Sequence, residues 1–209
     1  YMKIVLITGL FALLILTGCQ EEKSEPKRAV AKEITNLADS SFNKDSLLFS
    51  LSNQILVSIK NKDFHSFTKF MHPDSGTRFS PYAYITTSDK QLNRQDFLKA
   101  VNSGKLIDWG ITAGNGDIML LTVKDYFAKF VYDVDFIHAE KTSLNHFLGS
   151  GNSLNNLLEF YRNTEFTESY FSGFDKKYGG MDWRTLRLVY KKQQDEFYLV
   201  GIVHDEWTP

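Results

Sequence analysis

The sequence predicts an α+β protein in which N-terminal helices pack on a curved antiparallel sheet. Two observations favour this class. Apolar residues recur at helical spacing in the first half of the chain, whereas β-branched and aromatic residues dominate three segments near its C-terminus. Helices followed by a run of strands are typical of α+β folds. The chain has 209 residues, of which 43% are hydrophobic, so it is long enough for one domain with its own core.

Two helices are expected early in the domain. The first begins at Asp45, whose side chain can cap it. Its apolar face consists of Leu48, Leu51, Ile55 and Ile59. The second begins at Asp63 and ends near His72, because the following Pro73 disfavours helical backbone in the residue before it.

Three more helices are expected in the middle of the chain. One covers Asn93–Val101 and is closed by Gly104. The next begins at Thr122, which with Asp125 three residues later resembles a capping box. A short helix is expected over Ser153–Tyr161.

Strands are expected mainly at the end of the chain. Leu106–Thr112 is an isolated strand candidate, followed by a turn at residues 114–117. The β-rich segments are Glu165–Phe171, Trp183–Tyr190 and Phe197–Val203. Six polar residues separate the last two segments, which predicts a hairpin.

The first 18 residues have the layout of a secretory signal peptide. Lys3 supplies a positive charge, and Ile4–Leu16 is an apolar run. The run is shorter than the roughly 20 residues that a membrane-spanning helix needs. We therefore expect this segment to direct secretion and then to be removed.

Leu16-Thr17-Gly18-Cys19 resembles the lipobox of bacterial lipoproteins. The resemblance implies that Cys19, the single cysteine, carries a diacylglyceryl group and that its amine is acylated, for example with palmitate. The alternative is an ordinary secretory signal with a chance cysteine. Gln20 follows the cysteine, and the absence of Asp there favours the outer membrane if the cell is Gram-negative.

The remaining chain divides into a tether and a domain. Residues 19–31 are charged and lack an apolar period, which predicts a flexible tether. The alternative is that their last residues form a capped first helical turn. Residues 32–209 are expected to form a single globular α+β domain.

Three segments together resemble a family of uncharacterised bacterial lipoproteins. They are His72-Pro73 with Arg78-Phe79-Ser80-Pro81-Tyr82, Gly179-Gly180-Met181-Asp182-Trp183-Arg184, and His204-Asp205-Glu206-Trp207. This resemblance implies a secreted, lipid-anchored domain and brings no assigned activity.

A second resemblance concerns the fold. Val57–Phe64 is similar to the helical opening of the nuclear-transport-factor-two-like cone fold, and Phe197–Ile202 is similar to its closing strand. The resemblance implies helices that pack on a curved sheet and enclose a pocket. Another arrangement of helices on an antiparallel sheet remains the alternative.

One loop gathers candidate ligand-binding residues of different chemistry. His72, Arg78 and Tyr82 offer an imidazole, a cation and a phenol, and loops on a rigid scaffold often carry binding residues. Arg78 can bind a carboxylate or phosphate through two parallel hydrogen bonds. The alternative is that Asp74 and Gly76 shape a turn and that Arg78 pairs with a nearby acid.

The other candidate ligand-binding residues lie toward the C-terminus. They are Asp182, Trp183, His204 and Trp207. His204 is either part of a site or a histidine with a structural hydrogen bond at a strand end. The aromatic residues either line a pocket or cap the open end of the sheet. Asp133–Asp135 is interpreted as a solvated edge rather than a metal site.

Charge and motifs exclude several functions. The formal net charge is −1, which gives no electrostatic signature of nucleic-acid binding. We find no motif for a cofactor or metal, no nucleophile elbow and no zinc-protease pair. The partners expected are the membrane, through the lipid on Cys19, and a small molecule or an envelope protein.

Two classes of function remain open. The favoured one is a non-catalytic ligand-binding or interaction domain of a lipid-anchored envelope lipoprotein. The alternative is a pocket enzyme with general acid–base chemistry, of isomerase, dehydratase or hydrolase type. In that case His72, Asp182 or His204 would move a proton, and Arg78 or Tyr82 would stabilise an oxyanion.

Replacing Cys19 by Ser tests the anchor. Without the thiol no lipid can be attached, so we expect the protein to move from the membrane pellet to the soluble fraction. Fractionation of cells that express each form measures this. A variant that stays with membranes to the same extent as the unchanged protein would contradict lipid attachment at Cys19.

Overall fold

The structure, a computed structural model, describes residues 27–208, with side chains from residue 43 onward. The expected signal peptide, the lipobox and Cys19 lie outside the described residues. Contacts define one unit up to Ser40 and a second that begins at Ser41. Apart from the first part of helix α1, every described element belongs to the second unit.

Helix α1 (Lys27–Lys60) begins earlier than the sequence pattern predicts. The expected start at Asp45 is wrong, because the preceding residues include good helix formers, such as Ala29, Ala31 and Lys32, that extend the helix toward the N-terminus. The chain is also helical from Lys27, within the segment 19–31 that was expected to be a flexible tether.

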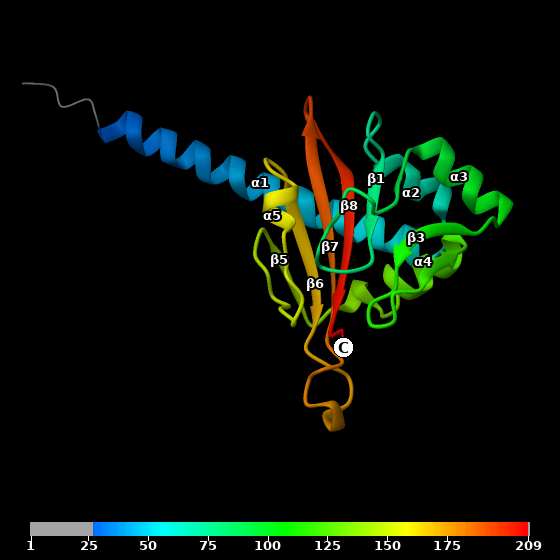
Figure 1. The fold of residues 1–209 in the computed structure, drawn as a ribbon. Helices are drawn as coiled ribbons and strands as arrows, with labels where there is room; N and C mark the ends of the chain where they lie inside the picture. The colour runs from blue at the N-terminus through cyan, green and yellow to red at the C-terminus, as the bar shows by residue number, and fades with distance from the viewer. Residues whose placement is uncertain (1–26, 209) are drawn as a thin grey trace, which may run out of the picture. The chain divides into compact units, whose positions relative to one another are not determined.

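A six-stranded sheet forms the centre of the unit, in the order β2-β1-β8-β7-β6-β5 (Figure 1). Its strands are β1 (Thr77–Ser80), β2 (Gln91–Leu92), β5 (Lys141–Leu144), β6 (Glu165–Phe171), β7 (Arg184–Gln193) and β8 (Glu196–Glu206). The α+β class is confirmed. The sheet is mixed rather than wholly antiparallel, because β1 runs parallel to β8 while the other neighbours are antiparallel. The β7–β8 hairpin is confirmed.

A separate two-stranded ribbon consists of β3 (Ile107–Ile111) and β4 (Ile118–Leu121). The strand expected over Leu106–Thr112 is confirmed, whereas β4 and the short strands β1, β2 and β5 are additional to the predicted set. The structure also contains two single-turn 3₁₀ helices, η1 (Phe136–His138) and η2 (Lys176–Tyr178).

Three of the expected helix starts are confirmed by their caps. They begin α2 (Phe64–Phe70), α3 (Arg94–Ser103) and α4 (Val123–Phe130). The side chains of Asp63, Asn93 and Thr122 each accept a hydrogen bond from a backbone N–H in the first turn. Gly104 closes α3 in the left-handed conformation, at φ 60°.

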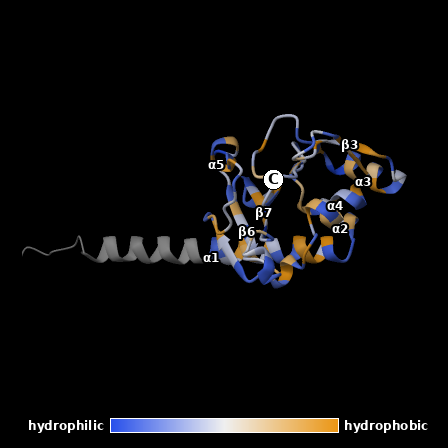
Figure 2. Cartoon of the chain, turned by 60° about the horizontal axis from the view of Figure 1, so that its bottom comes forward, coloured by the Kyte–Doolittle hydropathy of each residue, from blue (hydrophilic) through white to orange (hydrophobic). Residues whose placement is uncertain are grey.

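The part of helix α1 that follows Ser40 packs on one side of the sheet together with helices α2 to α4, and we call this side the helical face. Figure 2 shows hydrophobic and hydrophilic residues side by side on these helices, as in amphipathic helices. The core here is rich in aromatic rings with centroids 5.2–5.9 Å apart: Phe64, Phe67, Phe79, Phe97 and Phe127. Leu186, Leu188 and Ile202 of the sheet pack against the same core.

Residues 145–161 cover part of the opposite side, which we call the loop face. Their helix, α5 (Leu157–Phe160), is shorter than the expected Ser153–Tyr161. A smaller apolar cluster lies beneath them and consists of Ile85, Leu157, Phe166, Val189, Val200 and Val203. Asn156 fixes this cover, because its side chain both donates to and accepts from the backbone of Ile85.

The loop face also contains a buried triad of Glu168, Arg187 and Asp205. The Arg187 Nε donates to Glu168 at 3.0 Å, and its Nη1 donates to Asp205 at 3.1 Å. Its Nη2 donates to the carbonyl of Gly149, at 3.0 Å. Glu168 in turn accepts hydrogen bonds from the N–H groups of Leu148 and Gly149. Because every charged group is hydrogen-bonded, the triad can remain buried.

In the part of the chain that the structure describes, no helix has the length and apolar character needed to cross a membrane.

Replacing Arg187 by Met leaves Glu168 and Asp205 without their cation. We expect the free energy of unfolding to fall by about 3–5 kcal/mol, the cost of leaving buried charges unpaired. Urea unfolding followed by tryptophan fluorescence measures this.

Lys192→Met is the control, because Lys192 is exposed on the same strand and should change the stability little. If Arg187→Met lowers the free energy of unfolding by no more than the control does, the triad is not an important stabilising contact.

Candidate functional site

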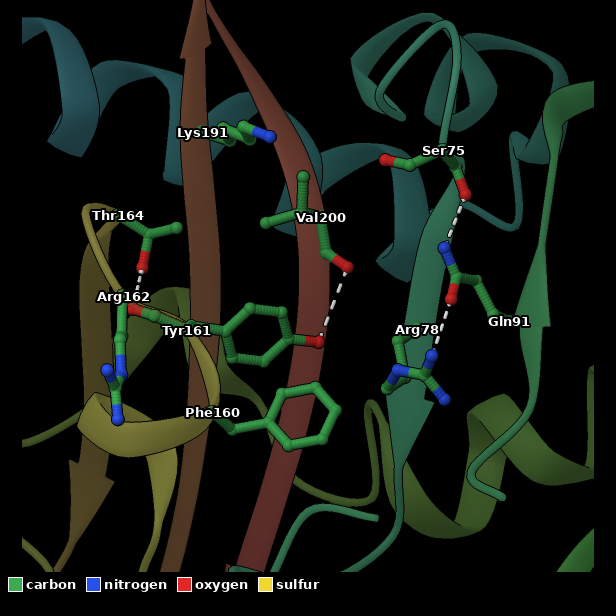
Figure 3. A pocket seen from close by; sticks show the side chains of 9 residues that line it. All are labelled: Ser75, Arg78, Gln91, Phe160, Tyr161, Arg162, Thr164, Lys191 and Val200. Carbon is green, nitrogen blue, oxygen red and sulfur yellow. Dashed lines mark hydrogen bonds between the residues drawn. The ribbon is translucent and has the colours of Figure 1, made fainter. Parts of the chain in front are cut away.

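A polar pocket of about 260 Å³ lies on the loop face, beside the cover formed by α5. Figure 3 shows Phe160, Tyr161, Arg162 and Thr164 on one side of it and Ser75, Arg78 and Gln91 on the other. We call it the cationic pocket. Its lining is Ser75, Arg78, Gln91, Phe160, Tyr161, Arg162, Thr164, Lys191 and Val200.

Arg78 is held rigidly at the edge of this pocket. It lies on β1 opposite Gly201 of β8, and since neighbouring Phe79 points into the helical-face core, Arg78 faces the other side. Its Nη1 donates to the carbonyls of Thr86, Thr87 and Asp89 at 2.6–3.3 Å. These bonds fix the 86–89 loop and orient the guanidinium.

Gln91 completes the support of Arg78. The Arg78 Nη2 donates to the Gln91 side-chain oxygen at 2.6 Å, and the Gln91 amide donates to the carbonyl of Ser75 (Figure 3). Among the described residues, Arg78 has no carboxylate within 4.0 Å, so the expected alternative of an ion pair is not what the structure contains. Its charge is left without a direct counter-ion.

Phe160 and Tyr161 form the aromatic wall of the pocket. The Arg78 guanidinium lies 5.5 Å from the centre of the Phe160 ring. The Tyr161 hydroxyl lies 3.5 Å from the carbonyl of Val200, and burial raises the pKa of this phenol, which therefore stays protonated. Tyr161 passes directly over Gly201, where a Cβ atom would lie 2.5 Å from the hydroxyl oxygen.

Two exposed cations complete the pocket. Lys191 extends from β7, and Arg162 lies just after the aromatic wall. Neither has an ion-pair partner within 4.0 Å among the side chains of residues 43–208. With Arg78 they give the lining three positive charges and no carboxylate.

His72 is a structural residue on the strand side of this region. It is buried, and its Nδ1 accepts hydrogen bonds from the N–H groups of Asp74 and Ser75. Burial lowers the pKa of the imidazole, and the charges of Lys191 and Arg94 lower it further, against an opposing effect of Asp74. The imidazole is therefore kept neutral and shapes the turn at residues 72–76.

Tyr82 and Asp182 each join two backbone segments. The Tyr82 hydroxyl accepts a hydrogen bond from the N–H of Ala113 in the β3–β4 turn. One carboxylate oxygen of Asp182 accepts from the N–H groups of Phe174 and Asp175, which closes the loop before β7. Neither residue lines the cationic pocket.

The two candidate tryptophans, Trp183 and Trp207, also lie outside the cationic pocket. Trp183 is buried and packs on the loop at residues 149–151, so closely that a Cβ atom on Gly151 would lie 2.7 Å from its ring. Trp207 lies largely exposed near the C-terminus. Close packing against Trp183 therefore explains the small residues of this loop.

His204 is fully buried on the helical face, next to a carboxylate. Its Nε2 lies 3.4 Å from Asp133, and its ring contacts that of Phe130 edge-on. Neither ring nitrogen has a well-formed hydrogen bond to the described residues. Asp133 also accepts from the Arg184 Nε at 2.9 Å, and Arg184 pairs with Glu206.

The interpretation of Asp133–Asp135 as a solvated edge holds for one residue only. Asp135 is exposed and pairs with Lys60, whereas Asp133 is mostly shielded by His204 and Arg184. Burial raises the pKa of the Asp133 carboxyl, but the two basic neighbours outweigh it, so the net pKa is lowered.

The predicted candidates therefore do not form one site. The backbone N–H of His72 donates to the carbonyl of Leu199 in β8, and His204 lies five positions further along the same strand. Of the seven candidates, Arg78 alone lines the cationic pocket. Sequence reasoning missed Lys191 and Arg162. The only sequence features that pointed to them are that Lys191 is a cation near the turn that ends its strand and that Arg162 follows two aromatic residues.

Two other hollows carry less chemical information. One, of about 250 Å³, lies between α1 and β6 and is lined partly by hydroxyls, with Ser52 already bonded to Thr167 and Tyr190. The other, of about 310 Å³, is an apolar groove between α1, α2 and the β7–β8 turn. No group of three or more metal-ligating side chains occurs in the described part of the chain.

A comparison of the chain with protein-family models finds no match, and a comparison with curated proteins finds none either.

The Asp133 cluster predicts a specific pH dependence of stability. The pKa of Asp133 is lower in the folded chain than its usual value of 3.8, so ionised Asp133 stabilises the fold above that pH. This contribution is lost as the pH falls through the folded-state pKa. We therefore expect Asp133→Asn to lower the free energy of unfolding at pH 7 and to have a smaller effect near pH 3.

Urea unfolding of both forms at the two pH values measures this. Asp195→Asn, at an exposed carboxylate in the β7–β8 turn, serves as the matched control and should have little effect at either pH. An Asp133→Asn effect of equal size at pH 7 and pH 3 would show that the charge of Asp133 is not what stabilises the cluster.

Proposed function

We propose that this chain is a lipid-anchored lipoprotein of the cell envelope whose domain binds a ligand in the cationic pocket and performs no catalysis. The apolar run Ile4–Leu16 and the lipobox-like Leu16–Cys19 support secretion and attachment through Cys19. Gln20 supports an outer-membrane location in a Gram-negative cell. The lipoprotein and cone-fold resemblances stay predictions.

One observation carries the binding proposal: the pocket has rigid hydrogen-bond donors and aromatic surfaces but no acid–base pair. The Arg78 guanidinium is held by four acceptors, so little conformational freedom remains to be lost when a ligand binds. Phe160 and Tyr161 offer apolar area beside it. Preorganised donors next to apolar surface are what a specific small-molecule site requires.

The positions of the acid–base groups argue against the enzyme alternative. His72 and Asp182 are engaged by backbone N–H groups in two different loops. His204 is 0% exposed, so a substrate has no direct access to its ring. A proton-transfer mechanism needs such groups within hydrogen-bond reach of one substrate.

Native mass spectrometry tests the proposal on the full chain, purified in mild detergent from its own cells. We expect a small molecule bound in stoichiometric amount, lost in Lys191→Met and kept in Lys192→Met. The two lysines are adjacent, and Lys192 does not line the pocket.

Two results would contradict the proposal. If the bound molecule is retained in Lys191→Met but lost when the apolar groove is altered by Leu51→Ala, the cationic pocket is not the ligand site. If the purified protein converts the bound molecule into a product, the non-catalytic part is wrong.

A further inference from the structure

We infer that the cationic pocket recognises a phosphate group, carried as a monoester by a small organic molecule. The inference rests on the proposed function, because it names the ligand class of the same pocket. It is based on the number of positive groups that line the pocket, on the hydrogen bonds that fix Arg78, and on the N–H donors that have no partner.

The first argument is charge. Arg78, Arg162 and Lys191 bring three positive charges to one small pocket, and no carboxylate is part of its lining. The two acids nearest to Arg78 along the chain are Asp74, which accepts a hydrogen bond from Gln193, and Asp89, which accepts from Ser80 and Thr86. A phosphate monoester carries close to two negative charges at pH 7, whereas a carboxylate carries one. The dianion therefore matches the lining better.

The second argument is the supply of free donors. Three backbone carbonyls occupy the Arg78 Nη1, and Gln91 occupies one hydrogen of Nη2. The Arg78 Nε and the second Nη2 hydrogen have no hydrogen-bond partner among the described residues. The same holds for the Lys191 ammonium, which Figure 3 shows extending from β7 toward the Ser75 side of the pocket. A fixed guanidinium and an ammonium without a hydrogen-bond partner, lining the same pocket, suit the several acceptor oxygens of a phosphate.

The third argument concerns the rest of the ligand. The volume of about 260 Å³ lies just below the range of roughly 300–1,000 Å³ that holds drug-sized molecules. Phe160, Tyr161 and Val200 provide apolar surface for a small organic part. The protonated Tyr161 hydroxyl adds no negative charge. The phosphate could come from a soluble monoester or from a lipid headgroup, since both present the same chemistry.

Calorimetric titration of the full chain in non-ionic detergent tests the inference. The probes are glycerol phosphate, the single-chain lipid lysophosphatidic acid, and acetate as a carboxylate of lower charge. We expect saturable binding of the phosphate compounds that weakens as salt is added, and weaker or no binding of acetate. Lys191→Met should weaken phosphate binding about tenfold or more, because it removes a charged donor.

Matched variants separate a pocket effect from a fold effect. Lys191→Arg should restore most of the binding, and Lys192→Met should leave it unchanged. Arg162→Met should weaken binding less than Lys191→Met, because the Arg162 Nε already donates a hydrogen bond to the carbonyl of Glu159. Circular dichroism of each variant checks that the fold is kept. Tighter binding of the lipid than of glycerol phosphate would identify a headgroup as the source, and equal binding would identify a soluble monoester.

The failure of this inference can be distinguished from failure of the proposed function. If an uncharged molecule co-purifies and is lost in Lys191→Met while no phosphate compound binds, the pocket is a ligand site and the phosphate inference is wrong. If phosphate binds equally to the unchanged protein and to the Lys191→Met and Arg162→Met variants, the inference is also wrong. If neither a co-purified molecule nor a phosphate compound depends on Lys191, both proposals are wrong.

Discussion

The buried triad of Glu168, Arg187 and Asp205 is the constraint on which the loop face depends. Its charges can stay buried only while backbone groups of Leu148 and Gly149 complete their hydrogen bonds. The triad therefore fixes the start of residues 145–161, and Asn156 fixes their middle on Ile85. Phe160 and Tyr161 follow at the end of this segment, so the aromatic wall of the cationic pocket is positioned by contacts made well before it in the chain.

Arg187 and Arg78 both lie on the loop face, but their positive charges are stabilised in different ways. The charge of Arg187 is compensated by two carboxylates, and its side chain is fully buried. Arg78 is held by neutral carbonyls and Gln91, which orient the guanidinium but leave its charge uncompensated. Because four neutral acceptors and no carboxylate hold the Arg78 guanidinium, its positive charge stays in a fixed position next to solvent. This difference distinguishes a structural cation from one available to a ligand.

The sequence predicted the parts of the fold that local chemistry determines. Capping residues such as Asp63 and Asn93, and the polar turn between β7 and β8, act over a few residues and were read correctly. The triad could not be foreseen, because Arg187 alternates with Leu186 and Leu188 in the way that residues facing water do, and Glu168 lies between two polar residues. The loop face is buried around the triad only because residues 145–161 cover it. Likewise β1 and the edge strand β5 are short segments whose pairing depends on distant strands. Lys191 and Arg162 come to line one pocket only after the sheet has formed.

The place of β8 in the sheet has a consequence for how the domain is made. This strand comes last in the chain, yet it lies between β1 and β7 and is the only link between them among the described strands. The parallel pairing with β1 joins residues more than a hundred positions apart. The six-stranded sheet therefore cannot form before β8 is available to pair with both neighbours. Because the pairing of β1 with β8 closes so long a loop, we expect formation of the complete sheet to be the slow step of folding.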